Sequence, residues 1–247
     1  MTAVGLPPVP TGRNAMNIKV LRRQSADEKP YWQIFSYERT TDDQTIAGML
    51  DELNYKDDLK DITGQPAPRI RWENSCLQGM CGACAMVING RPALACETFL
   101  RDLRADTIVL EPLRKFPVIA DLMVDRTVIQ EYLKAANAYI GEFSGADTKD
   151  HEHMYLSGRC LKCGLCLEVC PNYKGGKNFY GAAFANDCYL ISSRCRSRHD
   201  AIKESYEGHF EKGCSKSLSC ADVCPVNIPL LTTISKMRIL CRHGLCH

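Results

Sequence analysis

Four cysteines stand close together in the stretch GRCLKCGLCLEVCPNYKGG, residues 158–176, and a proline follows the last of them. Their spacing is C-x2-C-x2-C-x3-C-P. Thiolates at this density and spacing hold iron-sulfur clusters, and in this pattern the first three bind one cluster while the fourth crosses to another. The stretch therefore predicts a second copy elsewhere in the chain.

The second copy is KGCSKSLSCADVCPVNIP, residues 212–229, and one of its expected cysteines is replaced by Ser217. With the crossing ligands included, four thiolates predict a [4Fe-4S] cluster and three predict a [3Fe-4S] cluster, because a hard neutral hydroxyl is a poor ligand where iron expects a soft thiolate. The alternative, that Ser217 or a water binds a fourth iron, stays open. The predicted [4Fe-4S] ligands are Cys160, Cys163, Cys166 and Cys224, and the predicted [3Fe-4S] ligands are Cys170, Cys214 and Cys220.

A third group of cysteines lies in SCLQGMCGACAMVINGRPALAC, residues 75–96, with the spacing C-x4-C-x2-C and a fourth thiol beyond a turn. This is the plant-type [2Fe-2S] arrangement, and its predicted ligands are Cys76, Cys81, Cys84 and Cys96. Gly79, Gly82 and the small Ala83 would let the loop turn its backbone N–H groups toward a cluster. A structural zinc site is the alternative, although zinc sites favour two short cysteine pairs.

Composition limits the remaining classes of function. The net charge is +2 with acids and bases mixed, so no nucleic-acid partner is expected. We find no export signal and no apolar run near the roughly 18 residues of a membrane span, so a soluble or peripheral protein without disulfides is expected. The residues after 159 hold twelve Lys or Arg against seven Asp or Glu, which fits a solvated face or an anionic membrane surface.

The pattern of apolar residues predicts an α+β protein with two domains. Residues 1–15 read as a flexible leader, 16–117 as a strand-rich domain, and 118–247 as a helical domain that holds two clusters. Alternation of apolar and polar residues predicts the strands, Asn89-Gly90 predicts a hairpin turn, and spacings of three and four predict the helices. The expected strands are 16–23, 31–39, 68–73, the two arms within 84–96, and 107–113; the expected helices are 45–56 and 118–140, followed by a polar connection over 141–153.

Together these motifs resemble the iron-sulfur subunit of succinate dehydrogenase and fumarate reductase over about residues 16–240. The resemblance rests on SCLQGMCGACAMVINGRPALACET, CLKCGLCLEVCPNY and CSKSLSCADVCP, in the order of that family. It implies a β-grasp plant-type ferredoxin domain followed by an α-helical ferredoxin domain. It also implies an FAD-containing flavoprotein partner with the dicarboxylate site, and a membrane anchor where quinone binds. The chain would relay single electrons at the cytoplasmic face of the cell membrane, without a catalytic acid, base or nucleophile of its own.

The sequence departs from many succinate dehydrogenases of the family at the quinone end. Ser215 stands where a His is common, and residues 172–174 stand where Trp is common, so a menaquinone-type or other acceptor is open. Lys236 and Arg238 could face quinone or lipid headgroups, but surface solvation is the favoured explanation.

Several cysteine and histidine residues that could bind a metal or react lie outside these motifs. Cys188 and Cys195 are expected to be buried thiols, while His151 and His153 are expected to face solvent. The stretch CRHGLCH offers Cys241, His243, Cys246 and His247 to a metal, or is an incidental tail. Two other functions remain: a relay subunit of a glycerol-3-phosphate, glycolate or heterodisulfide-linked flavoprotein, and a zinc-stabilised interaction module.

Overall fold

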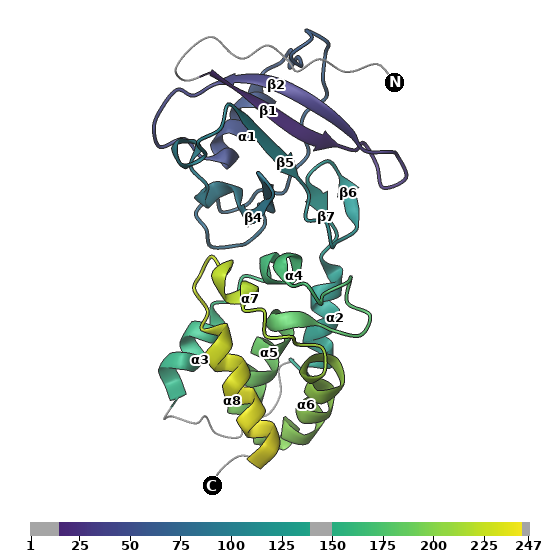
Figure 1. The fold of residues 1–247 in the computed structure, drawn as a ribbon, viewed down its shortest axis with the longest axis vertical. Helices are drawn as coiled ribbons and strands as arrows, with labels where there is room; N and C mark the ends of the chain where they lie inside the picture. The colour runs from purple at the N-terminus through teal and green to yellow at the C-terminus, as the bar shows by residue number, and fades with distance from the viewer. Residues whose placement is uncertain (1–14, 139–149, 244–247) are drawn as a thin grey trace. The chain divides into compact units, whose positions relative to one another are not determined.

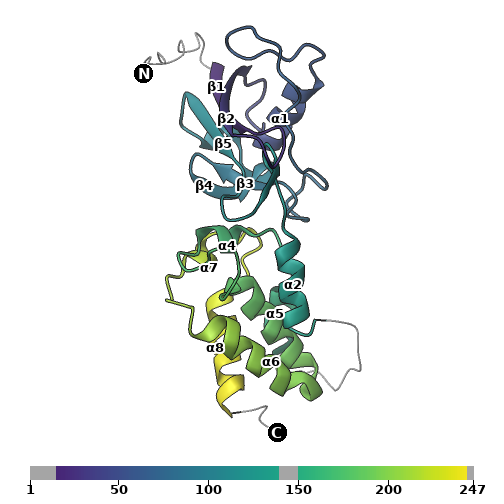
Figure 2. The same cartoon turned by 90° about the vertical axis from the view of Figure 1, so that its right-hand side faces the viewer.

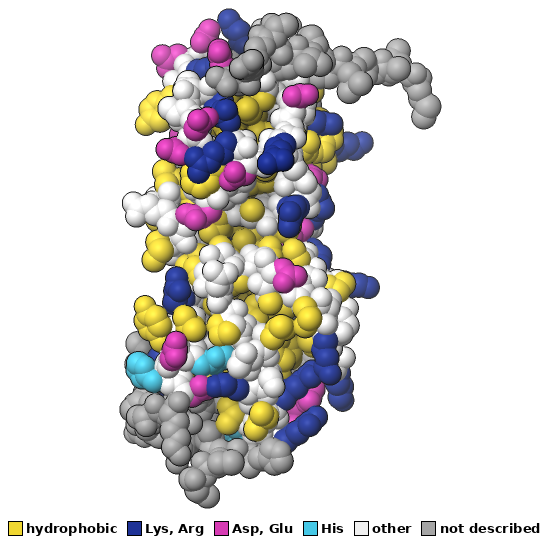
Figure 3. Space-filling model, turned by 60° about the vertical axis from the view of Figure 1, so that its left-hand side comes forward, with side chains coloured by type: hydrophobic (Ala, Val, Ile, Leu, Met, Phe, Trp, Pro, Cys, Tyr) yellow, Lys and Arg dark blue, Asp and Glu magenta, His cyan; other side chains and the backbone are white. Residues whose placement is uncertain are grey.

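The computed structural model describes residues 15–138 and 150–243, and the chain divides into two compact units, 1–124 and 125–247. The first unit is built on a sheet and the second on helices (Figure 1). Acidic and basic side chains are interspersed on the face drawn in Figure 3, in keeping with the small net charge. None of the helices in the described residues has the length and apolar character needed to cross a membrane.

The first unit contains a five-stranded mixed sheet with the order β2-β1-β5-β3-β4. Strand β1 pairs with β2 in antiparallel fashion and with β5 in parallel fashion. Apolar side chains on one face, among them Ile18, Val20 and Phe35, are fully buried and form the core. The strands are β1 (Ala15–Arg22), β2 (Tyr31–Glu38), β3 (Ala85–Ile88), β4 (Arg91–Leu94) and β5 (Thr107–Glu111).

Two predicted elements of this unit are confirmed in detail. Asn89 and Gly90 connect β3 to β4 with positive φ angles of 48° and 78°, as the hairpin signal requires. Helix α1 (Ile46–Tyr55) begins after Thr45, whose hydroxyl accepts a hydrogen bond from the Gly48 N–H at 3.1 Å. Its predicted apolar face, Ile46, Met49, Leu50 and Leu53, is buried.

The strand predicted at 68–73 is wrong, although its alternating pattern does reflect burial. Ile70 and Trp72 are buried, but the backbone is bonded mainly by side chains, and by the Leu122 N–H, which donates to the Arg71 carbonyl at 3.0 Å, instead of by a neighbouring strand. The side chain of Asn54 bonds both the N–H and the carbonyl of Ile70 at 2.8 Å, and Asp121 accepts from the Arg71 N–H at 2.9 Å. Alternation predicts which side chains are buried, but it does not say what the backbone bonds to.

The helix predicted from residue 118 is also wrong in its first part, because 118–124 form a short hairpin, β6 (Val118–Ala120) and β7 (Met123–Val124). Asp121 turns the chain with a φ of 44°. Its buried carboxylate accepts from the Arg23 N–H at 2.9 Å and forms a 3.0 Å ion pair with buried Arg22. The hairpin therefore belongs to the first unit, and the division falls after Val124 rather than near 117.

The second unit is helical, as predicted, with α5 at its centre (Figures 1 and 2). Helix α5 packs against α2, α3, α4, α6 and α8. The helices are α2 (Thr127–Ala135), α3 (His151–Gly158), α4 (Leu165–Val169), α5 (Gly181–Arg194), α6 (His199–Tyr206), α7 (Ser219–Asp222) and α8 (Leu230–His243).

The two histidines expected in a polar connection lie instead at the start of α3. His151 is exposed as predicted, but His153 is half-buried and its Nε2 lies 3.0 Å from the Thr233 hydroxyl on α8. The expectation for His153 is therefore wrong, because the polar residues here start a helix that packs against α8. Residues 1–14 of the predicted leader 1–15 lie outside the described residues, and Ala15 begins β1. Residues 139–140 of the predicted helix and 141–149 of the predicted connection also lie outside the described residues.

Candidate iron-sulfur cluster sites

The structure brings the four cysteines of the first group together in the sheet unit: Cys76, Cys81 and Cys84 lie on the loop before β3, and Cys96 lies in a short 3-10 helix after β4. The sulfur atoms of Cys84 and Cys96 lie 3.4 Å apart. Backbone N–H groups point at the sulfurs: Gly79 donates to Cys96 at 3.2 Å and Met80 donates to Cys76 at 3.3 Å. Amides turned inward around thiols stabilise the thiolate form that binds iron.

Unusual backbone angles make this loop possible. Gly79 and Gly82 have φ angles of 69° and 75°, in the left-handed region that glycine tolerates best. A Cβ on Gly79 would lie 2.6 Å from the Glu97 carboxylate, so a side chain there would require the Glu97 side chain to move. The glycines singled out in the sequence therefore allow the loop to close around its sulfurs.

The thiols of this loop differ in acidity. Amide donation, led by the Gln78 N–H, lowers the pKa of Cys76 to about 7. Burial, together with the neighbouring Cys84 thiol, raises the pKa of Cys96 to about 12. The loop apex is open to solvent, since Met80 is 66% exposed.

The second site is a cavity of about 30 Å³ in the helical unit, and it brings together all four cysteines predicted to hold the [4Fe-4S] cluster. Gly164 and Lys162, with φ angles of 87° and 55°, curl the chain around the cavity. Burial raises the pKa of Cys163 to about 11. The cysteines that line the cavity are Cys160, Cys163, Cys166 and Cys224.

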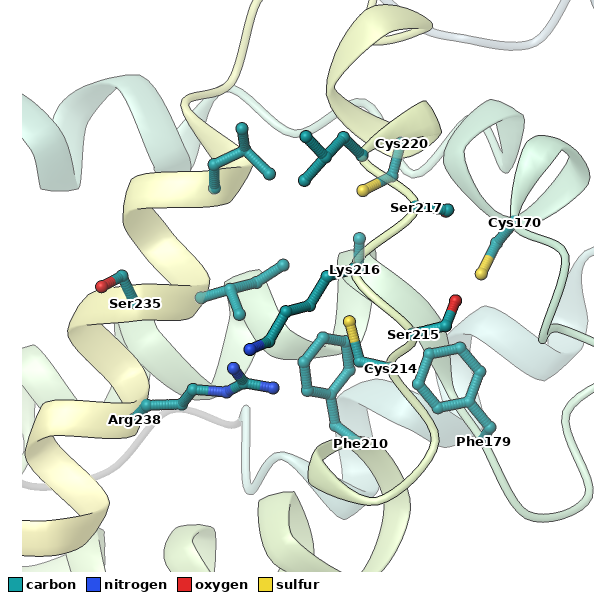
Figure 4. Close-up of a pocket in the computed structure, with 14 residues that line it drawn as sticks. Cys170, Phe179, Phe210, Cys214, Ser215, Lys216, Ser217, Cys220, Ser235 and Arg238 are labelled. Carbon is teal, nitrogen blue, oxygen red and sulfur yellow. The ribbon is translucent and has the colours of Figure 1, made fainter.

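The third site is a larger cavity of about 260 Å³, lined by Cys170, Cys214 and Cys220 (Figure 4). The three sulfur atoms point toward a common space, and Ser217 lies beside it in the position where a fourth thiol is missing. Burial raises the pKa of Cys220 to about 11, and the other two thiols add to the rise. Phe179 and Phe210 form part of the wall.

The two cavities of the helical unit share one helix in their walls. Ala182 of α5 lines the larger cavity, and the next residue, Ala183, lines the smaller one.

The two residues proposed for the quinone side behave differently. Arg238 extends from α8 into the larger cavity, where Lys216 also points (Figure 4). Lys236 does not line that cavity; its ammonium group pairs with the carboxylate of Asp150. Of the two, only Arg238 lies beside the predicted [3Fe-4S] ligands.

The remaining cysteines are not gathered into a further site in the described residues. Cys188 and Cys195 are buried, as predicted. Cys241 is buried within α8, and Cys246 and His247 lie outside the described residues. In the described part of the chain, no three His, Cys, Asp or Glu side chains are placed to hold a single metal ion.

The sequence reasoning missed Lys162, which lines the smaller cavity beside its cysteines. Its place between two predicted ligands, Cys160 and Cys163, is the signal that could have singled it out. A long charged side chain is unexpected at a position where the chain must curl around a buried site.

The sheet unit and the cysteine sites together define an iron-sulfur protein with a ferredoxin-like first domain. Residues 17–131 match the family model of the 2Fe-2S iron-sulfur cluster binding domain. The chain is 30% identical to the succinate dehydrogenase iron-sulfur subunit of Bacillus subtilis, over 88% of this chain and 89% of that one. It is 31% identical to the fumarate reductase iron-sulfur subunit of Haemophilus influenzae, over 91% of this chain and 92% of that one.

These likenesses establish the family: the chain belongs to the succinate dehydrogenase and fumarate reductase iron-sulfur subunits. The fold agrees. A chain in the structure of the Mycobacterium smegmatis Sdh1 complex in the apo form superposes with a TM-score of 0.73. The two sequences are 19% identical, and the match covers 94% of this chain and 99% of that one.

Proposed function

We propose that the protein is the electron-relay subunit of a succinate dehydrogenase or fumarate reductase. The observation that carries this proposal is the gathering of eleven cysteines into three separate sets, each with the members that the sequence pattern groups together. Bound clusters would supply one-electron transfer, in the order [2Fe-2S], [4Fe-4S], [3Fe-4S]. In this role the chain would need no acid, base or nucleophile of its own.

The partners follow from the family membership. A flavoprotein subunit with FAD would exchange electrons with succinate or fumarate, and a membrane anchor would bind the quinone or menaquinone. The chain would be peripheral at the cytoplasmic face of the cell membrane. Arg238 and Lys216, which point into the larger cavity, give the acceptor side a positive charge.

The residues of this chain would bind and tune the cofactors. In the first unit, a β-grasp ferredoxin domain in this proposal, inward amides hold the thiolates of Cys76 and Cys96. In the second unit, an α-helical ferredoxin domain in this proposal, Cys163 is buried and the other predicted ligands are partly buried. The Ile228 N–H donates to the Cys224 sulfur at 3.4 Å. Hydrogen bonds to sulfur, burial and nearby charge are the means by which a protein adjusts cluster potentials.

The two-cluster assignment of the second unit is supported by which cysteines share a cavity. Cys224 lines the cavity of Cys160, Cys163 and Cys166, whereas Cys170 lines that of Cys214 and Cys220. Each crossing cysteine thus lies with the set that the sequence pattern assigns to it. Four thiols fit a [4Fe-4S] cluster, and three thiols with Ser217 fit a [3Fe-4S] cluster.

Electron paramagnetic resonance of the native complex, purified without oxygen, tests the function. As isolated, we expect the signal of an oxidised [3Fe-4S] cluster. Adding succinate should remove that signal and produce the signal of a reduced [2Fe-2S] cluster. If dithionite changes the spectrum and succinate does not, the chain serves a different flavoprotein. Protein without iron would contradict the relay and favour a zinc-stabilised interaction module.

A further inference from the structure

The smaller cysteine cavity has a charged side chain in its wall. Lys162 lies between the ligand positions Cys160 and Cys163 and lines the same cavity as the four cysteines. Its φ of 55° is in the left-handed region, which is sterically costly for a residue with a Cβ. The backbone N–H of Lys162 donates to the Cys160 sulfur. Both its main chain and its side chain therefore face the thiols.

The partner of this lysine is a buried carboxylate on the central helix. The Lys162 ammonium forms an ion pair with the Asp187 carboxylate of α5. The Asp187 side chain is 5% exposed and that of Lys162 is 30% exposed. Among the described residues, the second carboxylate oxygen of Asp187 has no hydrogen-bond partner, so Lys162 provides the charge compensation that the structure records.

The two charged residues differ in their position relative to the cavity of the thiols. Lys162 lines the cavity, whereas Asp187 does not. The pair is thus a dipole with its positive end toward the cysteines.

We propose that the Lys162–Asp187 ion pair sets the reduction potential of the cluster held by Cys160, Cys163, Cys166 and Cys224. The positive charge of Lys162 favours the reduced state of that cluster. The proposal rests on the [4Fe-4S] assignment made above. Reduction adds one electron, delivered by the flavoprotein, and one unit of negative charge at this site, with no proton. A nearby cation lowers the energy of that added charge and a nearby anion raises it, most strongly where water is excluded.

The sign of each charge predicts the direction in which its removal shifts the midpoint potential of the cluster. Lys162→Met removes the nearer, positive charge and should shift the midpoint potential of the [4Fe-4S] cluster downward. Asp187→Asn removes the farther, negative charge and should shift it upward. The double variant should lie below wild type but above Lys162→Met, because the removed dipole had its positive end toward the cluster. Lys162→Arg keeps the charge and should shift the potential far less than Lys162→Met.

The test is a redox titration of the complete complex, in which electron paramagnetic resonance follows the reduced [4Fe-4S] signal against potential. Iron content per chain is measured in each variant. Lys134→Met is the matched control: this lysine of α2 is exposed and pairs with exposed Glu131, so its loss should leave the potential unchanged. Reduction of the cluster in the titration uses mediators and dithionite, so the result does not depend on turnover.

The outcomes separate this inference from the function on which it rests. Opposite shifts in the two single variants support the ion pair as a tuning element. Unchanged potentials, or shifts in the same direction, overturn it and leave only a packing role. If Lys162→Met loses the cluster, the midpoint potential of the Asp187→Asn variant decides. A higher potential supports the inference, and an unchanged or lower potential overturns it. A wild-type complex without any reduced [4Fe-4S] signal would contradict the cluster assignment itself.

Discussion

Ser217 shows how much a single side chain decides at the residue scale. It lines the cavity of Cys170, Cys214 and Cys220 at the place where the repeated pattern expects a thiol. A hydroxyl of similar size fits the same space, but it is a hard neutral ligand. The protein can therefore keep the fold of a four-thiol site while offering three thiolates.

Two substitutions at this position test the [3Fe-4S] assignment. We expect Ser217→Cys to add one iron per chain, from about nine to about ten, because a soft ligand completes the set. The oxidised [3Fe-4S] signal should disappear from the spectrum. Ser217→Ala should leave iron content and signal unchanged. Loss of iron in Ser217→Ala would show instead that the hydroxyl binds a fourth iron.

At the scale of elements, the turn between β6 and β7 holds three segments of the first unit together. The Asp121 carboxylate bonds the backbone after β1, the backbone of residue 71, and the buried guanidinium of Arg22. Arg22 in turn donates to the carbonyls of Pro68 and Arg69, at 3.0 and 3.1 Å. One buried ion pair thus replaces the strand pairing that residues 68–73 lack.

Breaking this ion pair should destabilise the first unit. Asp121→Asn leaves Arg22 buried without its counter-charge, which costs about 3–5 kcal/mol. We expect the temperature at which the [2Fe-2S] absorbance is lost to fall by roughly 10 °C or more. Asp43→Asn is the control, because that carboxylate is 85% exposed in its ion pair with Arg101 and should matter little. Equal melting of the two variants would refute the role of Asp121.

Whether an element can be predicted from the sequence depends on whether local or long-range interactions stabilise it. The helix at 46–55 and the Asn89-Gly90 hairpin follow from local patterns, and both are confirmed. The cysteine groups follow from ligand spacing, which is local within each motif. Residues 68–73 and 118–124 could not be assigned because Asp121 joins them over a long separation. Lys162 was missed because its role depends on Asp187 of a distant helix.

At the scale of the whole molecule, each set of cysteines lies within one unit. The 76–96 set belongs to the first unit, and the two other sets belong to the second. The first unit also has its own sheet and its own buried core. The hydrogen bonds described at the first site are all made by residues before Val124.

Residues 15–124 produced alone should therefore fold and bind about two irons. Reduction with dithionite should give a [2Fe-2S] signal and no signal from the other clusters. A chain ending at 117 is the informative comparison, because it lacks the β6–β7 hairpin and leaves Arg22 without Asp121. We expect that shorter chain to be less stable. Equal stability of the two would contradict the placement of the hairpin in the first unit.

The two cavities of the second unit also impose an order of events during synthesis. Cys224 lines a cavity whose other cysteines lie at 160–166, and Cys170 lines one completed only by residues 214–220. A nascent chain emerges from its N-terminal end, and its domains fold in that order. The first site can receive its cluster while the second unit is still being translated. The other two sites are complete only once Cys220 and Cys224 have left the ribosome, so neither can be filled before that point.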